Sequence, residues 1–173
     1  MLVVYKVRLR TMVKTDAGAI LKIYEEGIQT GHATFEDKVP DWHKWDSGHL
    51  TQCRWLAEEE DTVLGWGALT QVSPRKVYSG VAEVSIYVSL NAQNQGIGSI
   101  LLERLIISSE EYGFWTLQAQ VFPENKISIY VHEKYGFRKS ATRRQLALMS
   151  YGSIAGEWRD VILMERRSKI VGI

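Results

Sequence analysis

Polar and apolar residues alternate along residues 83–89, which read Glu-Val-Ser-Ile-Tyr-Val-Ser. This period of two, together with the β-branched and aromatic side chains, predicts a strand. Because successive side chains of a strand point to opposite faces, Glu83, Ser85 and Tyr87 are expected on one face. The opposite, apolar face is then made of Val84, Ile86 and Val88.

The apolar positions change to a helical period after this strand. From Ser99 onward they recur every three or four residues, which predicts an amphipathic helix that ends at Gly113. The turn before it contains Gly96 and Gly98. A glycine turn at a helix N-terminus presents unpaired backbone N–H groups and admits a phosphate closely. It has neither the third glycine of a dinucleotide fingerprint nor the Lys-Ser/Thr ending of a P-loop.

The same two periods predict the other elements. Further strands are expected over residues 5–10, 54–58, 63–69, 115–121, 145–149 and 158–165. Further helices are expected over residues 17–26 and 40–45, and from residues 122–125 to the glycine at 136, with a loop over residues 73–80. The order β-α-α-β-β-β-α-β-α-β-β has antiparallel strands and two β-α crossovers. It predicts an α+β fold with a mixed sheet rather than a doubly wound one.

Length and composition narrow the function. The chain of 173 residues is long enough for a single domain, residues 1–173, with a proper core. Its 21 Lys and Arg residues nearly balance its 20 Asp and Glu residues, which argues against nucleic-acid binding. The single cysteine, Cys53, excludes an internal disulfide and is typical of a reducing compartment. Without a membrane-length apolar segment or a signal-peptide pattern, we expect a soluble cytoplasmic protein.

Residues 93–98, Gln-Asn-Gln-Gly-Ile-Gly, resemble the Gln/Arg-x-x-Gly-x-Gly/Ala signature of the GNAT acetyltransferases. The chain is similar to their phosphinothricin and methionine sulfoximine N-acetyltransferase branch from Val7 to Ser168. The stretches that carry this similarity are residues 31–36, 81–88, 122–125, 132–137 and 158–160. The resemblance implies the acyl-CoA N-acyltransferase (GNAT) fold, with a mixed central sheet splayed at the fourth strand and helices on both faces. It also implies acetyl-coenzyme A as cofactor and a homodimer.

The resemblance assigns the cofactor site. In the family the glycine turn binds the pyrophosphate, and the coenzyme enters the gap beside the fourth strand. Backbone N–H groups near Tyr87 and Val88 would polarise the thioester carbonyl, and Asn125 matches the position that binds the pantetheine arm. The full set is Ile86, Tyr87, Val88, Gln93, Asn94, Gln95, Gly96, Ile97, Gly98, Ser99, Asn125 and Ser128.

Two residues are candidates for proton transfer. An α-amino group is mostly ammonium at neutral pH, and a carboxylate within reach can remove its proton. The family gives this role to the glutamate that matches Glu83, and a solvated strand-end carboxylate is the alternative. His132 lies at i+7 from Asn125 on one helix face with Ser128. The family implies a proton-transfer role for His132, and a structural histidine is the alternative. The residues expected to pack this helix are Ile127, Tyr130 and Val131.

The acceptor side is less specified by the sequence. The carboxylate of an amino-acid analogue suits an arginine, and Arg75, with Tyr78 beside it, is the candidate. A solvated loop cation is the alternative. Thr34 and Phe35 match the stretch that walls the family's pocket. The connection over residues 149–157 is longer than the family's tight turn, which leaves the acceptor open. The tryptophans assigned to the core are Trp42, Trp45, Trp55 and Trp66.

Together these features predict an acetyl-CoA-dependent N-acetyltransferase for the α-amino group of a small amino-acid analogue. Direct attack in a ternary complex is expected, since Cys53 lies apart from the glycine turn and gives no sign of an acyl-enzyme. The acceptor is a small-molecule amine, and no metal is expected. The alternatives are another amine, such as a polyamine, an aminoglycoside or a protein N-terminus, and a non-catalytic coenzyme A-binding module.

Overall fold

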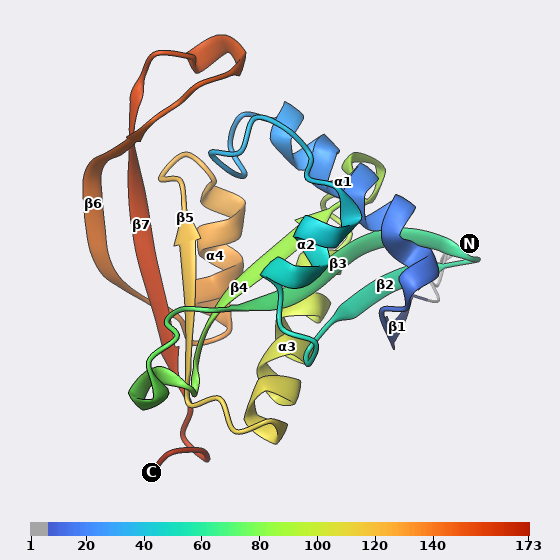
Figure 1. Ribbon diagram of the computed structural model, residues 1–173, viewed down its shortest axis with the longest axis vertical. Helices are drawn as coiled ribbons and strands as arrows, with labels where there is room; N and C mark the ends of the chain where they lie inside the picture. The colour runs from blue at the N-terminus through green and yellow to red at the C-terminus, as the bar shows by residue number, and fades with distance from the viewer. Residues whose placement is uncertain (1–6) are drawn as a thin grey trace.

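The computed structural model describes residues 7–173 and contains one mixed sheet in the order β1-β2-β3-β4-β5-β7-β6 (Figure 1). Neighbouring strands are antiparallel except β4 and β5, which are parallel. The strand predicted over residues 5–10 lies partly outside the described residues. The strands are β1 Arg8–Thr11, β2 Trp55–Glu59, β3 Thr62–Gln71, β4 Val81–Val88, β5 Thr116–Val121, β6 Arg138–Leu148 and β7 Trp158–Arg167.

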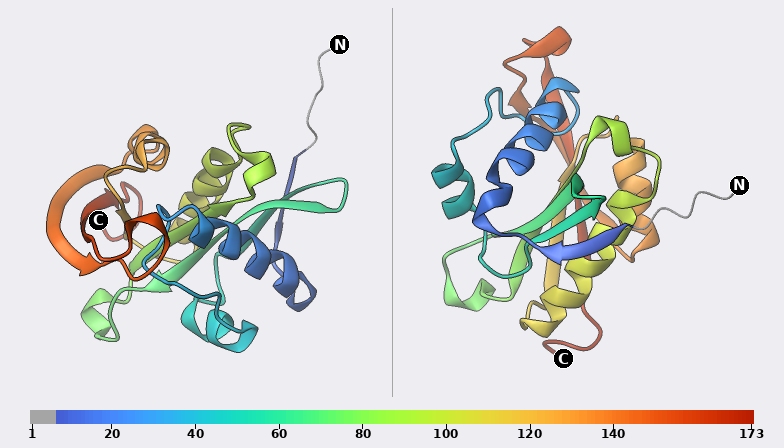
Figure 2. Two further views of the ribbon diagram at one scale, coloured as in Figure 1. Left: turned by 90° about the horizontal axis from the view of Figure 1, so that it is seen from above. Right: turned by 90° about the vertical axis from the view of Figure 1, so that its right-hand side faces the viewer.

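Helices cover both faces of the sheet, with α1 and α2 on one side and α3 and α4 on the other (Figure 2). Their bounds are α1 Ala17–Gln29, α2 Trp42–Gly48, α3 Ile97–Glu111 and α4 Lys126–Lys134. Single 3-10 turns lie at η1 Lys14–Asp16, η2 Lys76–Tyr78, η3 Leu90–Ala92 and η4 Gly152–Ile154. Among residues 7–173, no helix has the length and apolar character needed to cross a membrane.

The alternation along β4 separates two cores, as its sequence predicts. Val84 packs toward α3 with Leu102 and Leu105. On the opposite face, the ring of Tyr87 stacks on Trp66 with centroids 4.8 Å apart. That second core also contains the buried residues Ile20, Ile23, Trp45 and Leu56, with Trp42 packed against it, and Trp55 packs against the first core.

The splay expected at the fourth strand is present. β4 pairs with β5 only over its first three residues, Val81 to Glu83, and then the two strands separate. The backbone of β4 beyond Glu83 remains paired with β3 alone. The fold therefore opens a gap beside β4 directly after the predicted catalytic carboxylate.

Three details differ from the sequence-based expectation. The prediction of a strand over residues 145–149 was too short, since β6 begins at Arg138. Its first half is an exposed sheet edge and carries no apolar alternation that a pattern could detect. α1 continues past Gly27 rather than ending there. A Cβ at position 27 would approach the Tyr87 ring to 2.7 Å, so the glycine leaves room for the Tyr87 side chain. On α4, Ile127 and Tyr130 are exposed, and Ile129 is buried instead.

Candidate functional site

The glycine turn leaves open space in front of the N-terminus of α3. Asn94 and Gly96 have left-handed backbone angles, with φ of 62° and 80°, which brings the chain sharply into the helix. The first helical bonds run from the N–H groups of Ser99 and Ile100 to the carbonyl of Gly96. The N–H groups that precede them lie outside the helical bonding pattern, as at any helix start. A Cβ at Gly96 would meet no atom within 4 Å.

The other residues of the turn have separate tasks. Gln93 and Asn94 are exposed, and the side-chain amide of Gln95 donates to the carbonyl of Asn91 at 3.1 Å. Ile97 is buried beneath the turn and fixes it on the core. A Cβ at Gly98 would meet only a Val88 methyl group at 3.8 Å, an ordinary contact. Space and free backbone donors thus fit a phosphate group at this turn.

The backbone of β4 decides which of its N–H groups face the gap. The N–H of Ser89 donates to the carbonyl of Leu64 on the β3 side. Because antiparallel bonding alternates, the backbone groups of Tyr87 also point toward β3. Those of Ile86 and Val88 point the other way, toward the gap. Of the two N–H groups expected to face a thioester, that of Val88 points toward the gap, whereas that of Tyr87 points toward β3. The N–H group of Ile86, which was not predicted, also points toward the gap.

Glu83 stands at the point where β4 and β5 separate. Its carboxylate accepts a hydrogen bond of 2.7 Å from the side-chain amide of Gln120 on β5. The amide oxygen of Gln120 in turn accepts from Arg143 Nη1 at 3.1 Å. Glu83 also shares a strand face with Ser85, roughly 6–7 Å further along β4. A fixed, partly exposed carboxylate is therefore available beside the gap.

His132 is buried on α4, and its two ring nitrogens are inequivalent. Nδ1 lies 2.7 Å from the carbonyl oxygen of Ser128, so Nδ1 carries the proton and donates it. Nε2 is buried and has no hydrogen-bond partner among the described residues. Burial lowers the pKa of His132 from its ordinary value of 6.5, which keeps the ring neutral at neutral pH. An Nε2 lone pair is therefore free to accept a proton.

Asn125 begins α4. Its side-chain oxygen accepts from the N–H of Ser128 at 3.1 Å, and its amide nitrogen lies 3.4 Å from the carbonyl of His32. The face shared by Asn125, Ser128 and His132 was predicted from spacing, and the contacts confirm it. Asn125 caps a helix here, while its predicted contact with the pantetheine arm stays a prediction.

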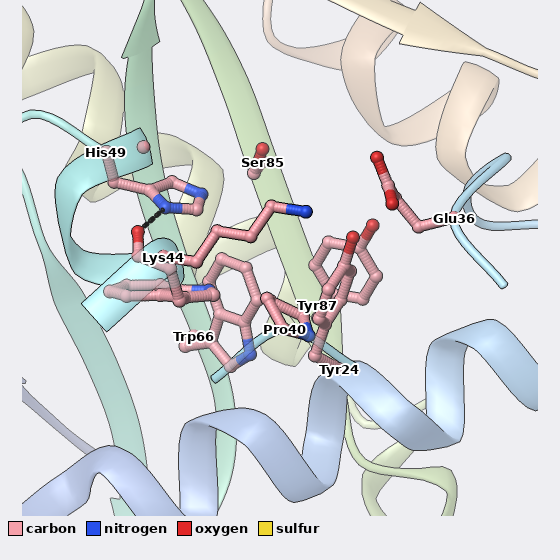
Figure 3. Close-up of a pocket in the computed structure, with 10 residues that line it drawn as sticks. Tyr24, Glu36, Pro40, Lys44, His49, Trp66, Ser85 and Tyr87 are labelled. Atoms are coloured by element: carbon pink, nitrogen blue, oxygen red, sulfur yellow. Dashed lines mark hydrogen bonds between the residues drawn. The ribbon is translucent and has the colours of Figure 1, made fainter. Parts of the chain in front are cut away.

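A pocket opens on the α1 and α2 side of β4 (Figure 3). Its volume is about 230 Å³, smaller than the roughly 300–1,000 Å³ of drug-sized ligand sites. Ser85 and Tyr87 form its floor on the Glu83 face of the strand, and burial raises the pKa of Tyr87, which stays a neutral hydroxyl. The other lining residues are Tyr24, Glu36, Pro40, Lys44, Trp45, Gly48, His49 and Trp66.

None of the four predicted acceptor residues lines this pocket. Arg75 and Tyr78 are exposed on the connection between β3 and β4, where the guanidinium lies 5.4 Å from the tyrosine ring centre. Neither lines the pocket. Thr34 and Phe35 lie in the segment that leads to Glu36, and Phe35 packs edge-on against Phe122 at 4.8 Å. Trp45 and Trp66 belong to the core, as predicted, and also line the pocket.

Comparison with known proteins identifies the chain. It matches the acetyltransferase (GNAT) family over residues 19–137, more than half of its length. The chain belongs to the GNAT acetyltransferase family. A phosphinothricin N-acetyltransferase from Alcaligenes faecalis is 31% identical over 168 residues, which cover 91% of this chain and 81% of that protein.

Solved structures agree with this membership. The phosphinothricin acetyltransferase of Sinorhizobium meliloti, in complex with acetyl-coenzyme A, has a TM-score of 0.84 at 26% identity and covers 96% of this chain and 90% of its own. Ribosomal-protein-alanine N-acetyltransferase from Brucella melitensis has a TM-score of 0.82 at 27% identity, with coverages of 93% and 99%. The predicted fold, enzyme class and acetyl-coenzyme A cofactor are thereby confirmed.

Several residues of this GNAT acetyltransferase escaped the sequence reasoning. Arg159 on β7 is buried and donates to the carbonyl of Gly31 at 2.6 Å and to Glu124 at 2.9 Å. Arg159 thereby joins three of the segments that resemble the family in sequence, residues 31–36, 122–125 and 158–160. Gln120 could have been found from the polar face of β5. Lys44 and Glu36 carry no pattern, because each is a single polar residue, one on the short helix α2 and the other in the irregular segment after α1.

Proposed function

We propose that the protein acetylates the α-amino group of a small amino-acid analogue, of the phosphinothricin or methionine sulfoximine type. The observation that carries this proposal is the position of Glu83, fixed by Gln120 where β4 and β5 separate. Glu83 is the last residue of β4 paired with β5, and it shares a strand face with Ser85 and Tyr87, which form the pocket floor. The phosphinothricin N-acetyltransferase of Alcaligenes faecalis supports the acceptor class.

The residues divide the reaction between them. Acetyl-coenzyme A supplies the acetyl group as a thioester. Glu83 removes a proton from the acceptor ammonium, directly or through one water, which exposes the nitrogen lone pair for attack. The N–H groups of Ile86 and Val88, which point toward the gap, hold the carbonyl oxygen as negative charge develops on it. The glycine turn at Gly96 and Gly98 holds the pyrophosphate end.

His132 serves as the second proton-transfer group. Its neutral ring presents a free Nε2 lone pair, since Nδ1 is engaged with Ser128. In that state it can take up a proton and later return it to the departing thiolate. It lies on α4, whose N-terminus is capped by Asn125.

Direct attack by the amine is favoured over an acyl-enzyme. Cys53 is buried beside Trp55 and Ser108 rather than at the gap, and burial raises the pKa of its thiol. A thiol in that state is a poor nucleophile. A non-catalytic coenzyme A-binding module is disfavoured because it would not need the Gln120–Glu83 contact.

We also propose a single-domain cytoplasmic enzyme that forms a homodimer. The exposed edge strand β6 carries Leu146 and Leu148, and Trp158 stands opposite Leu148 on β7 with 60% of its surface exposed. Apolar side chains on the edge strand of a sheet favour association with a second chain. Light scattering should give twice the chain mass, and Trp158→Glu should reduce it to the monomer.

A thiol-release assay with a panel of amines tests the proposed function. Phosphinothricin, methionine sulfoximine, spermidine, an aminoglycoside and an alanine-starting peptide should be compared at matched concentrations. The two amino-acid analogues should give the highest kcat/KM, and Glu83→Gln should abolish most of that activity. Preference for the peptide would instead favour the reaction named for the Brucella melitensis neighbour. Turnover of none of these amines would contradict the proposal.

A further inference from the structure

The Glu83 carboxylate is directed along the sheet rather than straight across it. The residue directly opposite Glu83 on β5 is Gln118, and this is the last register pair of the two strands. The hydrogen bond of 2.7 Å to the carboxylate nevertheless comes from the side-chain amide of Gln120, two residues further along β5. Two residues of a strand span roughly 6–7 Å, and both parallel strands run toward the gap. The contact therefore draws the carboxylate toward the opening between β4 and β5.

The other neighbours of Glu83 on this face of the sheet do not compete for its carboxylate. Gln118 donates instead to Glu165 on β7, at 3.1 Å. On the opposite side, the residue of β3 that faces Glu83 is Thr70, which is uncharged. Among the described residues, Gln120 is the one hydrogen-bond donor to the Glu83 carboxylate. The direction of this carboxylate thus depends on the Gln120 amide.

Arg143 determines which end of the Gln120 amide faces Glu83. It lies on the edge strand β6 and reaches across β7 to β5, since the strand order is β4-β5-β7-β6 (Figure 1). Its Nη1 donates to the amide oxygen of Gln120 at 3.1 Å. A guanidinium has donors only, so it keeps the amide oxygen on its own side and leaves the amide NH₂ group for Glu83. The reversed amide would place its oxygen against the carboxylate, where two acceptors repel one another.

The positive charge of Arg143 is kept one side chain away from Glu83. Within residues 7–173, no carboxylate oxygen lies within 4.0 Å of the Arg143 guanidinium. An arginine in direct contact with Glu83 would stabilise the ionised carboxylate and make it a weaker base. The neutral amide of Gln120 gives the carboxylate a fixed direction without that ion pair. The hydrogen bond is made to Oε2, and no described residue donates to Oε1.

We propose that Gln120 and Arg143 are positioning residues for the general base Glu83. Arg143 fixes the Gln120 amide, and the amide holds Glu83 Oε2 so that Oε1 receives the proton of the acceptor ammonium. The proton passes from nitrogen to Oε1, and the electron pair of the broken N–H bond stays on nitrogen for the attack. This inference rests on the proposed function and adds two residues that act through Glu83 rather than on the substrates.

A double-variant cycle on kcat/KM for methionine sulfoximine, at saturating acetyl-coenzyme A, tests this inference. Gln120→Leu should lower kcat/KM by at least roughly tenfold, because the base is no longer held in one direction. The same change in a Glu83→Gln background should have no further effect, since Gln120 acts through the carboxylate. Arg143→Met should cause a smaller loss, of about threefold, and Arg143→Lys should restore most of it because lysine also donates.

Two further variants separate positioning from a general loss of structure. Arg138→Met removes another exposed arginine of β6, one that contacts Glu165 at 3.3 Å, and should keep the wild-type kcat/KM at every pH. Gln120→Glu keeps the size of the side chain but cannot donate when ionised, so its loss should equal or exceed that of Gln120→Leu. Both Gln120 deficits should shrink as pH rises, because a carboxylate that has lost a donor takes up a proton more readily. Urea midpoints confirm that each variant is folded.

The outcomes keep this inference apart from the proposed function. Wild-type activity of both Gln120 variants beside a defective Glu83→Gln enzyme would overturn the positioning role alone. Losses that add in the double variant, or that do not change with pH, would overturn it as well. Preference for another amine of the panel would overturn the proposed acceptor and leave the positioning role standing, since the cycle is then measured with that amine. Full activity of Glu83→Gln would overturn both the base and its positioning.

Discussion

The hydroxyl of Tyr151 donates a hydrogen bond of 2.8 Å to the backbone carbonyl of Thr34. This contact joins the connection between β6 and β7 to the segment that leads from α1 to the pocket on β4, and the two lie side by side in Figure 1. Burial raises the pKa of Tyr151, so the hydroxyl keeps its proton and its donor role. The long connection over residues 149–157 thus supports the pocket wall.

Removing that hydroxyl should loosen the wall without touching the cofactor site. We expect Tyr151→Phe to lower the free energy of unfolding by about 1 kcal/mol, the net value of one hydrogen bond. The KM for the acceptor should rise, while the KM for acetyl-coenzyme A stays within experimental error. Steady-state kinetics with each substrate varied in turn measures both, and an equal rise in the two would contradict a local effect.

Glu83→Gln should keep the size of the side chain but lose the base. We expect kcat/KM to fall by roughly 10²–10⁴, the usual contribution of a general base. The deficit should shrink as pH rises, because more of the acceptor then arrives as free amine. A pH–rate profile of the variant and the wild type measures this. Wild-type activity of Glu83→Gln at neutral pH would show that the carboxylate is structural.

Gly98→Val tests the pyrophosphate position at the glycine turn. A Cβ at Gly98 touches only Val88 at an ordinary distance, so the protein itself can accept a side chain there. We expect acetyl-coenzyme A to bind at least roughly tenfold more weakly, since the added methyl groups fill the phosphate space. Calorimetry on the folded variant checks this. Gly96 is a poorer test, because its φ of 80° would strain any replacement.

The buried imidazole of His132 should make stability depend on pH. Its folded-state pKa is lowered by burial, while the unfolded chain keeps a value near 6.5. Below about pH 6.5 the unfolded state binds a proton that the folded state resists, so stability falls as pH decreases. His132→Gln should reduce the loss in urea midpoint between about pH 7.5 and about pH 5.5. Part of the pH dependence should persist in this variant, because burial also lowers the pKa of His49.

Arg159→Met should weaken the attachment of β7 to the rest of the site. The variant loses the charged hydrogen bonds to Gly31 and Glu124, and also the stacking of the guanidinium on Phe122 at 3.7 Å. We expect the free energy of unfolding to fall by about 2 kcal/mol. The loss should be smaller than for a fully buried ion pair, because Glu124 is mostly solvent-exposed. Urea denaturation measures it, and an unchanged midpoint would contradict the assignment.

Local patterns were sufficient for most elements. The helical period over α3 arises from burial on one side, and the period of two over β4 arises because its two faces pack against different cores. The glycine turn is equally local, since its backbone angles require glycine at 96. The catalytic candidate Glu83 came from strand alternation together with the resemblance of its segment to the family.

Tertiary structure decided what the local patterns could not record. The first half of β6 escaped detection because an exposed edge strand buries too little to impose alternation. Lys44 and Glu36 line one pocket only because α2 and the segment after α1 fold onto the same face of β4. The sequence by itself determined most of the elements, the glycine turn and the family. The pocket on β4 depends on contacts between distant segments, and such contacts leave no periodic trace in either one.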